Sequence, residues 1–278
     1  QRFMGIEFLR QKEMVALWGK SVFHGSGVTA SFEHYNDFGT YLVFMLSLVF
    51  ALLISKAKRI DKLFLFFLLL LLQASLILTF SRGSWLALGH VFLLMLPLLI
   101  VKNKFSIFKV IAYVLIFLII ILVIPGLGKH LIFILSTKTD ADRLIVWQQT
   151  INMIKLHPFL GFGLGTFMDN FQDYMPKELF YMRYVHNCYL QIWAEAGIFS
   201  LLSFLIFTVS ILYRGIKGFY SAQNSNFTLL GFTCGFLGIM VHSFFDTPLY
   251  SLQLSALFWF MAGFILALAR LGKKKEIL

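Results

Sequence analysis

Long apolar runs dominate this chain, and several of them are long enough to cross a membrane. A helix of 17 residues rises through about 25 Å, close to the roughly 30 Å thickness of a bilayer's hydrocarbon core. The composition agrees, because 59% of the 278 residues are hydrophobic and only 13% are charged. A soluble domain carries about 25% charged residues. We therefore predict an all-α fold, a polytopic transmembrane helical bundle that forms a single membrane domain over residues 1–278.

Hydropathy and length together predict seven membrane spans. They cover residues 38–54, 63–80, 85–101, 107–124, 190–213, 229–245 and 249–269. Basic residues cluster at the same end of alternate spans, in 56–59, 102–104, 214–217 and 270–275. The positive-inside rule assigns that end to the cytoplasm, so the C-terminus is predicted to be cytoplasmic.

The opposite side of the membrane then receives a tight turn at 81–84, a turn at 242–248 and a long extracytoplasmic loop over residues 125–189. A long loop is usually functional, and the amphipathic stretch 144–156 predicts a helix on the membrane surface. Nearly every candidate chemical group falls on this outer side, which indicates a membrane enzyme that acts on a substrate already carried across the bilayer. These groups are Arg82, Arg143, His157, His186, His242 and Asp246.

Several other classes are disfavoured by the sequence. The net charge of +11 comes from clusters beside apolar runs, so membrane topology explains it and no nucleic-acid partner is expected. Cys188 and Cys234 show no metal-ligand spacing. The chain starts at Gln1 without a signal peptide, and we expect it to be the C-terminal part of a longer protein.

Two arginines are candidates for binding an anion. Arg82 lies between two apolar spans, where a cation is costly unless it is paired or solvated; the alternative is an interfacial arginine that reaches lipid phosphates. Arg143 opens the predicted surface helix, with Asp140 or Asp142 as its N-cap. Its guanidinium can bind a phosphate bidentately or form an ordinary ion pair with either aspartate. The Asp140-x-Asp142 pair also resembles a metal site, but a cap explains it.

The segment from His157 to Gly165 alternates three glycines with bulky apolar residues. It lacks the Lys-Ser/Thr end of a P-loop and the context of a dinucleotide fingerprint. Two interpretations remain open: close approach of the backbone to a lipid-linked ligand, or a bent loop that dips into the membrane.

His186 and Asn187 lie where the long loop enters the next span. Neighbouring cations would keep the imidazole of His186 neutral, which suits a general base, although a satisfied interfacial histidine is the plain alternative. Glu195 follows within the first turns of that span, and we expect it to orient His186 or to pair with an arginine. His242 and Asp246, four residues apart, predict a local pair that stabilises a helix end.

A series of motifs follows one order between residues 32 and 197. They are Phe32-Glu33-His34-Tyr35-Asn36-Asp37-Phe38-Gly39, Ser81-Arg82-Gly83-Ser84-Trp85, Arg143 with Trp147, Pro158 with Gly161, Gly163 and Gly165, and His186-Asn187 with Tyr189, Gln191, Glu195 and Gly197. Together they resemble the O-antigen ligase and polymerase superfamily of bacterial membrane glycosyltransferases.

The resemblance implies an inner-membrane enzyme whose active site faces the periplasm or extracytoplasmic side. Its donor would be an undecaprenyl-diphosphate-linked glycan, and its acceptor a glycan, lipid A core or a protein. Transfer would be inverting and would use no metal or cofactor. Arg82 and Arg143 would neutralise the diphosphate, and His186 would activate the acceptor. We expect Gly161, Gly163, Asn187 and Glu195 to line the substrate site.

A secondary transporter of a small anion or solute is the main alternative. A carrier would place ionisable groups near the membrane midplane and show broken helices in paired repeats. The predicted spans are almost free of charge, and the two halves of the sequence do not mirror each other. The transferase is therefore the favoured interpretation.

Overall fold

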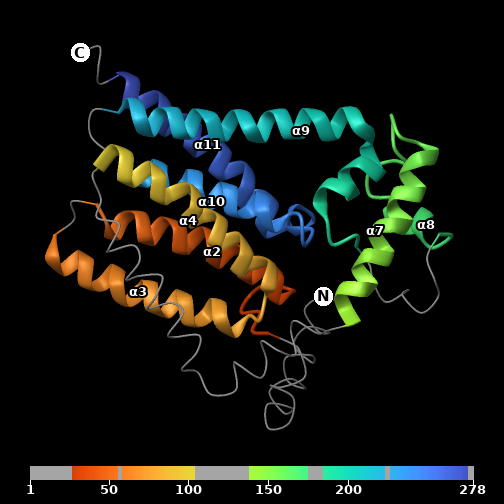
Figure 1. Ribbon diagram of the computed structural model, residues 1–278, viewed down its shortest axis with the longest axis horizontal. Helices are drawn as coiled ribbons and strands as arrows, with labels where there is room; N and C mark the ends of the chain where they lie inside the picture. Colours follow the sequence, from red (N-terminus) through yellow and green to blue (C-terminus); the bar gives the residue numbers. More distant parts are fainter. Residues whose placement is uncertain (1–26, 56–57, 104–137, 175–183, 223–225, 275–278) are drawn as a thin grey trace, which may run out of the picture.

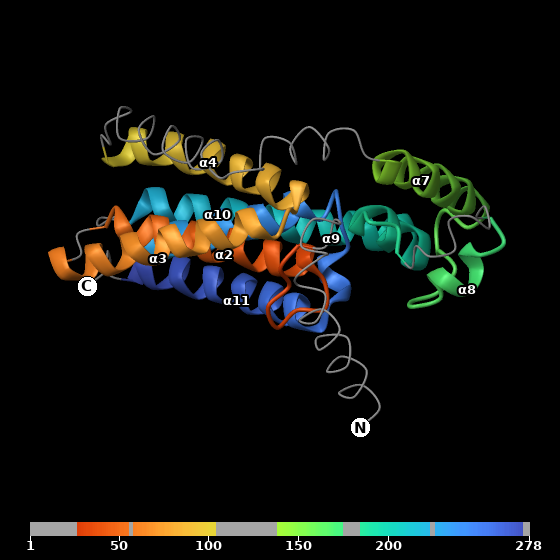
Figure 2. The ribbon, with the colours of Figure 1, turned by 90° about the horizontal axis from the view of Figure 1, so that it is seen from below.

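The computed structural model describes residues 27–55, 58–103, 138–174, 184–222 and 226–274, and these residues are all-helical. A bundle of long helices forms the larger part, and a smaller lobe lies beyond one end of it (Figures 1 and 2). This arrangement confirms the predicted all-α membrane fold.

Five helices of the bundle are long and apolar enough to span a membrane. They are α2 (Tyr35–Leu53), α3 (Arg59–Leu78), α4 (Arg82–Asn103), α9 (Cys188–Ser221) and α11 (Leu252–Lys274). A sixth apolar helix, α10 (Phe227–His242), has 16 residues. Six of the seven predicted spans therefore coincide with helices, and the span predicted at 107–124 lies outside the described residues.

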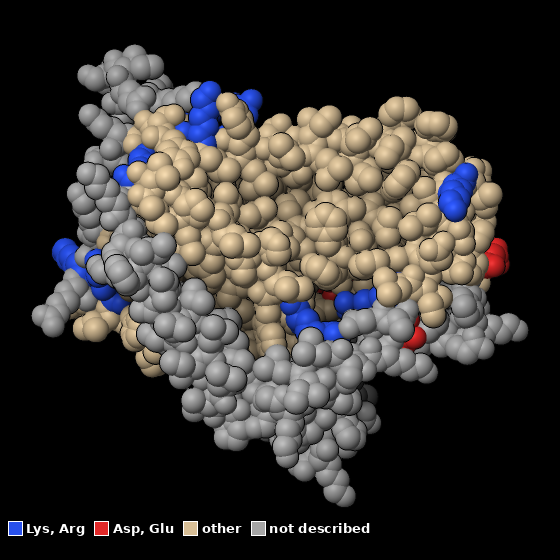
Figure 3. All heavy atoms as spheres, in the orientation of Figure 1, with Lys and Arg blue, Asp and Glu red and all other residues tan. Residues whose placement is uncertain are grey.

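The basic residues that flank the spans meet at one end of the bundle. Lys102, near the C-terminal end of α4, donates to the backbone carbonyls of Phe219, of Tyr220 at 2.9 Å and of Ala222 at 2.7 Å, around the end of α9. Lysine at a helix C-terminus satisfies carbonyls that have no partner within the helix. Figure 3 shows blue side chains gathered at this end and a tan surface along the bundle. The spans thus alternate as the charge pattern predicts.

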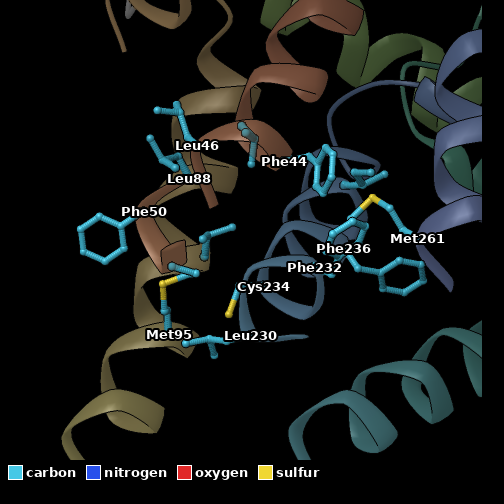
Figure 4. Packing of buried hydrophobic residues seen from close by; sticks show 14 of the residues in the cluster. Phe44, Leu46, Phe50, Leu88, Met95, Leu230, Phe232, Cys234, Phe236 and Met261 are labelled. Carbon is cyan, nitrogen blue, oxygen red and sulfur yellow. The ribbon is translucent and has the colours of Figure 1, made fainter. Parts of the chain in front are cut away.

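Helix α10 is the centre of the bundle, because α2, α4, α9 and α11 all pack against it. Most of its apolar side chains are buried, and the close-up in Figure 4 shows Leu230, Phe232, Cys234 and Phe236 among their packed neighbours. Three glycines, four and three residues apart, allow the neighbouring helices to approach. A Cβ at Gly231, Gly235 or Gly238 would lie 2.8 Å or less from atoms of α2. Small residues at such spacing are typical of helix contacts in membranes.

The lobe contains α7 (Lys138–Leu156) and α8 (Phe167–Phe171), which pack against the first turns of α9. Its own apolar cluster includes Val146, Met153, Phe167 and Phe171. The long loop predicted at 125–189 therefore contains helices, as expected. Helix α7 begins six residues before the predicted start at 144, so Asp140 and Asp142 lie inside α7 rather than at its N-cap.

A methyl group at the centre of the bundle should loosen it. In Gly231→Ala the new Cβ would lie 2.8 Å from the backbone Cα of Leu48, which cannot rotate away. We expect a loss of about 1–3 kcal/mol in stability, as for other overpacked cores, seen as a lower unfolding temperature in detergent. Gly263→Ala in α11 is the control, because a Cβ there meets nothing within 4 Å. Equal unfolding temperatures for the two variants would contradict the close packing.

Candidate active site

A small open pocket lies where the bundle meets the lobe. The beginnings of α2 and α4, the second turn of α7 and the end of α10 supply its walls. The lining residues are Tyr35, Asn36, Phe80, Arg82, Gly83, Arg143, His242 and Phe245. In Figure 3 blue atoms lie in a hollow beside the grey segments, at the junction between α4 and α7 seen in Figure 1.

The pocket brings together Arg82 and Arg143, which the sequence predicted to lie on the same side of the membrane. The structure corrects the predicted turn at 81–84, because Arg82 is the first residue of α4 and Ser81 Oγ accepts from Ser84 N at 3.4 Å. Within the described part of the chain, the buried Nε of Arg143 has no hydrogen-bond partner. Two guanidinium groups on one pocket suit an anion with several oxygens, since each can donate a planar pair of hydrogen bonds.

His186 is hydrogen-bonded to a buried carboxylate. Its Nδ1 lies 3.0 Å from Oδ1 of Asp246. Burial alone would raise the pKa of Asp246, but the hydrogen bond from His186 and the nearby positive charge of Arg143 lower it below its usual range. An ionised carboxylate can only accept, so Nδ1 is the donor; in a neutral imidazole the lone pair is then on Nε2. This is the arrangement of a histidine base with an orienting acid.

The backbone of His186 adopts a conformation that non-glycine residues rarely use. Its φ is +52°, in the left-handed region, which costs on the order of 1 kcal/mol or more and persists only where neighbours hold it. Helix α9 begins two residues later, and its first amide, Cys188 N, donates to Ser243 O at 2.8 Å and Asp246 O at 3.2 Å. The turn after α10 thus fixes both the backbone and the imidazole of His186.

Asn36 joins the two parts of the site. Its Nδ2 donates to Asp246 Oδ2, and the same residue lines the arginine pocket. Asp246 Oδ1 also accepts from Thr247 N at 2.8 Å. Asn36 belongs to one of the sequence motifs, but the sequence predicted no role for it. A buried amide in the first turn of an apolar span was the available signal, because such a group requires a partner.

His242 and Asp246 do not form the predicted local side-chain pair. His242 is 1% exposed, and its ring nitrogens contact Thr40 Oγ1 at 2.6 Å and Ser84 Oγ at 3.3 Å. Asp246 reaches His186 instead, and a backbone bond from Asp246 N to His242 O at 3.1 Å is what connects the two locally. His242 therefore links α2, α4 and α10 at the floor of the pocket.

Glu195 has other partners than those predicted for it. Its Oε2 accepts from Tyr250 OH at 3.0 Å, and its Oε1 accepts from Gln191 Nε2 at 3.3 Å. The position expected of Glu195, next to His186, is occupied by Asp246. Asn187 is likewise used locally, because its Oδ1 caps α9 by accepting from Tyr189 N and Leu190 N at 3.0 and 3.1 Å.

The glycine-rich segment is bound to α9 by its backbone. Phe162 N donates to Ala194 O and Gly163 N donates to Glu195 O, both at 2.9 Å. A Cβ at Gly161, whose φ is +71°, would lie 2.5 Å from the carbonyl of Glu195. The close approach that these glycines permit is therefore to α9. Neither of the two sequence interpretations includes this contact, which depends on a break in a distant helix.

That break occurs at Gly197, the one non-helical residue within α9, with φ +78° and ψ 175°. A Cβ there would lie 2.0 Å from Phe159 O. Where the helix is interrupted, backbone groups need partners outside the helix, and the glycine-rich segment supplies an acceptor: Ile198 N donates to Pro158 O at 3.0 Å. Among the described residues, no group of three or more His, Cys, Asp or Glu side chains could hold a metal.

Comparison with known proteins finds a family model that matches half of the chain. A model described as O-antigen ligase matches residues 67–205. A Rickettsia felis protein curated as "Putative polysaccharide ligase" is 27% identical over 157 residues, and a Rickettsia typhi protein of the same name is 29% identical over 153. Each match covers 52% of this chain and 35% of the relative, so the chain spans about a third of the length of these relatives.

The contact between the glycine-rich segment and α9 should fail when Gly197 gains a methyl group. In Gly197→Ala we expect faster amide hydrogen exchange at Phe162, Gly163 and Ile198, because the clash with Phe159 O pushes the two backbones apart. Gly165→Ala is the matched control, since its φ is also positive, at +72°, but a Cβ there meets nothing within 4 Å. Unchanged exchange in Gly197→Ala would refute the docking.

Proposed function

Since this chain belongs to the O-antigen ligase family, we propose that it is a membrane glycosyltransferase that moves a glycan from an undecaprenyl-diphosphate carrier to an acceptor hydroxyl. The acceptor is a glycan, lipid A core or a protein. One observation carries the proposal: Arg82 and Arg143 line a pocket that shares Asn36 with the hydrogen-bonded pair of His186 and Asp246.

The proposed reaction is a single displacement. Nε2 of His186 removes the proton of the acceptor hydroxyl while its oxygen forms a bond to the anomeric carbon. The bond from that carbon to the diphosphate oxygen breaks on the opposite face, so the configuration inverts. Undecaprenyl diphosphate departs with one more negative charge than it had in the donor. Asp246 stabilises the imidazolium that forms on His186 and holds its Nδ1 in place.

Arg82 and Arg143 are proposed to bind the diphosphate and to stabilise the charge it gains. Preorganised cations directed at the position where charge develops are among the largest contributions to catalysis. A partly buried pocket strengthens them, because water screens the charges less. Two arginines can supply this stabilisation without a metal, and we propose metal-independent transfer. The unsatisfied Nε of Arg143 supports the assignment, since a buried donor gains most from a ligand.

We propose that the pocket faces the periplasm or extracytoplasmic side of the bacterial inner membrane. Lys102, Arg214 and Lys217 lie at the opposite end of the bundle, and basic residues at span ends favour the cytoplasm. A carrier-linked glycan presented on the outer leaflet would meet the pocket from that side.

Removing the imidazole should slow transfer strongly and spare donor binding. We expect His186→Ala to lower kcat by about 10²–10⁴-fold, the range for a general base, with the donor dissociation constant unchanged. Asp246→Asn should also lower kcat, because the amide cannot hold a charged imidazole, and should alter the pH profile of kcat. The control is His90→Ala, an exposed histidine two turns along α4. Full activity of His186→Ala would contradict the proposed base.

Lysine should not replace either arginine of the pocket. Arg82→Lys and Arg143→Lys keep the charge but lose the bidentate geometry, and a hydrogen bond to a charged group contributes about 1.5–3 kcal/mol. We expect roughly 10- to 100-fold weaker binding of an undecaprenyl-diphosphate glycan and a lower kcat. Arg214→Lys, exposed at the far end of α9, serves as the control. Wild-type affinity in both pocket variants would rule out the diphosphate assignment.

A further inference from the structure

Three large apolar side chains project from the turn that follows α7. Phe159 is 62% exposed, Leu160 82% and Leu164 80%. We call these residues the apolar tip. In Figure 1 the tip's segment connects α7 to α8 beside the bend of α9, and Figure 3 shows a mostly tan surface at that corner. We propose that the apolar tip is inserted among the acyl chains of the adjacent membrane leaflet, where it anchors the lobe.

The backbone of the tip is suited to a dry environment. Gly161 N donates to His157 O at 3.0 Å, and Phe162 N, Gly163 N and Ile198 N form the bonds that join the segment to α9. Trp193 Nε1 also donates to Pro158 O at 3.0 Å. Non-helical backbone can enter a membrane only where protein satisfies its polar groups. The tip therefore presents side chains to its surroundings while α9 pairs much of its backbone.

The depth of the tip follows from its contact with α9. The ring of Phe159 stacks on that of Phe199, with centroids 6.1 Å apart. Phe199 precedes Arg214 by 15 residues, or about 22 Å of helix. Arg214 is exposed at the basic end and marks one boundary of the apolar region. A hydrocarbon core of about 30 Å therefore extends beyond Phe199, which puts the ring of Phe159 inside it.

The exposed surface of α9 between Phe199 and Arg214 carries no charged side chain. Its exposed side chains after the bend are apolar, serine or, from position 213 onward, tyrosine and basic. Phe199 is 62% exposed, and Leu202, Ile206 and Val209 are 47%, 67% and 62% exposed. This row must face lipid in a membrane-spanning helix, and the tip extends it into the lobe. Lys155 and His157, exposed next to the tip, suit the headgroup layer just outside.

The anchor fixes the height of α7 above the bundle. The tip follows directly after α7, which carries Arg143, while Arg82 belongs to a helix of the bundle. Insertion of the tip into lipid therefore holds Arg143, in the lobe, at a fixed position relative to Arg82, in the bundle. This inference depends on the membrane fold and on the α9 contact, so it stands or fails independently of the proposed chemistry.

The test places a fluorophore on the tip of the full chain in phosphatidylcholine vesicles. Leu160→Cys, labelled with an NBD maleimide, reports its surroundings, and the native Cys188 and Cys234 are buried and shielded from the reagent. Asp169→Cys, at an exposed acidic position of α8, is the matched control. We expect spin labels on the lipid acyl chains to quench the label at 160 several-fold more than the label at 169. Aqueous iodide should show the reverse order.

Two results would overturn the anchor. Strong iodide quenching at 160, equal to that at 169, would place the tip in water. Protection from both iodide and the lipid spin labels would mean that protein covers the tip, either another part of the full chain or a second copy. Substitution at a side chain that is 82% exposed leaves the packing intact, so the measurement reads position rather than folding.

Discussion

The carboxylate of Asp246 holds the functional end of the molecule together. It accepts hydrogen bonds from Asn36 of α2, from His186 before α9 and from the amide of Thr247. A buried charge is costly unless such partners satisfy it, and removing one partner leaves an uncompensated group. Three segments that are distant in the sequence must therefore meet at this point. The arginine pocket forms on the same frame, since Asn36 lies in its wall.

The packing of α10 makes this convergence possible. Its glycines let α2 approach closely, and α2 carries Asn36 and Thr40 to the end of α10, where His242 and Asp246 lie. Without that close contact, the hydrogen bonds of the site would have to span a wider gap. The apolar core thus sets the distances on which the polar site depends. Packing and chemistry are connected through one helix pair.

The sequence predicted the fold more completely than the site. Hydropathy and charge located six helices, because burial in lipid acts on each segment separately. Topology also predicted that Arg82 and Arg143 lie on the same side of the membrane, and the family resemblance implied that they share a ligand. The partner of His186 was not, since Glu195 is near in sequence and Asp246 is near in space. The role of Gly161 was missed for the same reason: it depends on a bend at Gly197, and residue patterns do not show such contacts.

The short length of α10 has a consequence for the electrical environment of the site. Its 16 residues rise about 24 Å, and it begins at the basic end, where Asn226 caps it. That rise is about 6 Å less than the thickness of a 30 Å hydrocarbon core. Asp246, in the turn that follows, is 7% exposed, so mobile ions screen its carboxylate poorly. Attraction between the site and an anion is consequently insulated from the ionic strength outside, unlike that of the exposed lysines and arginines at the other end.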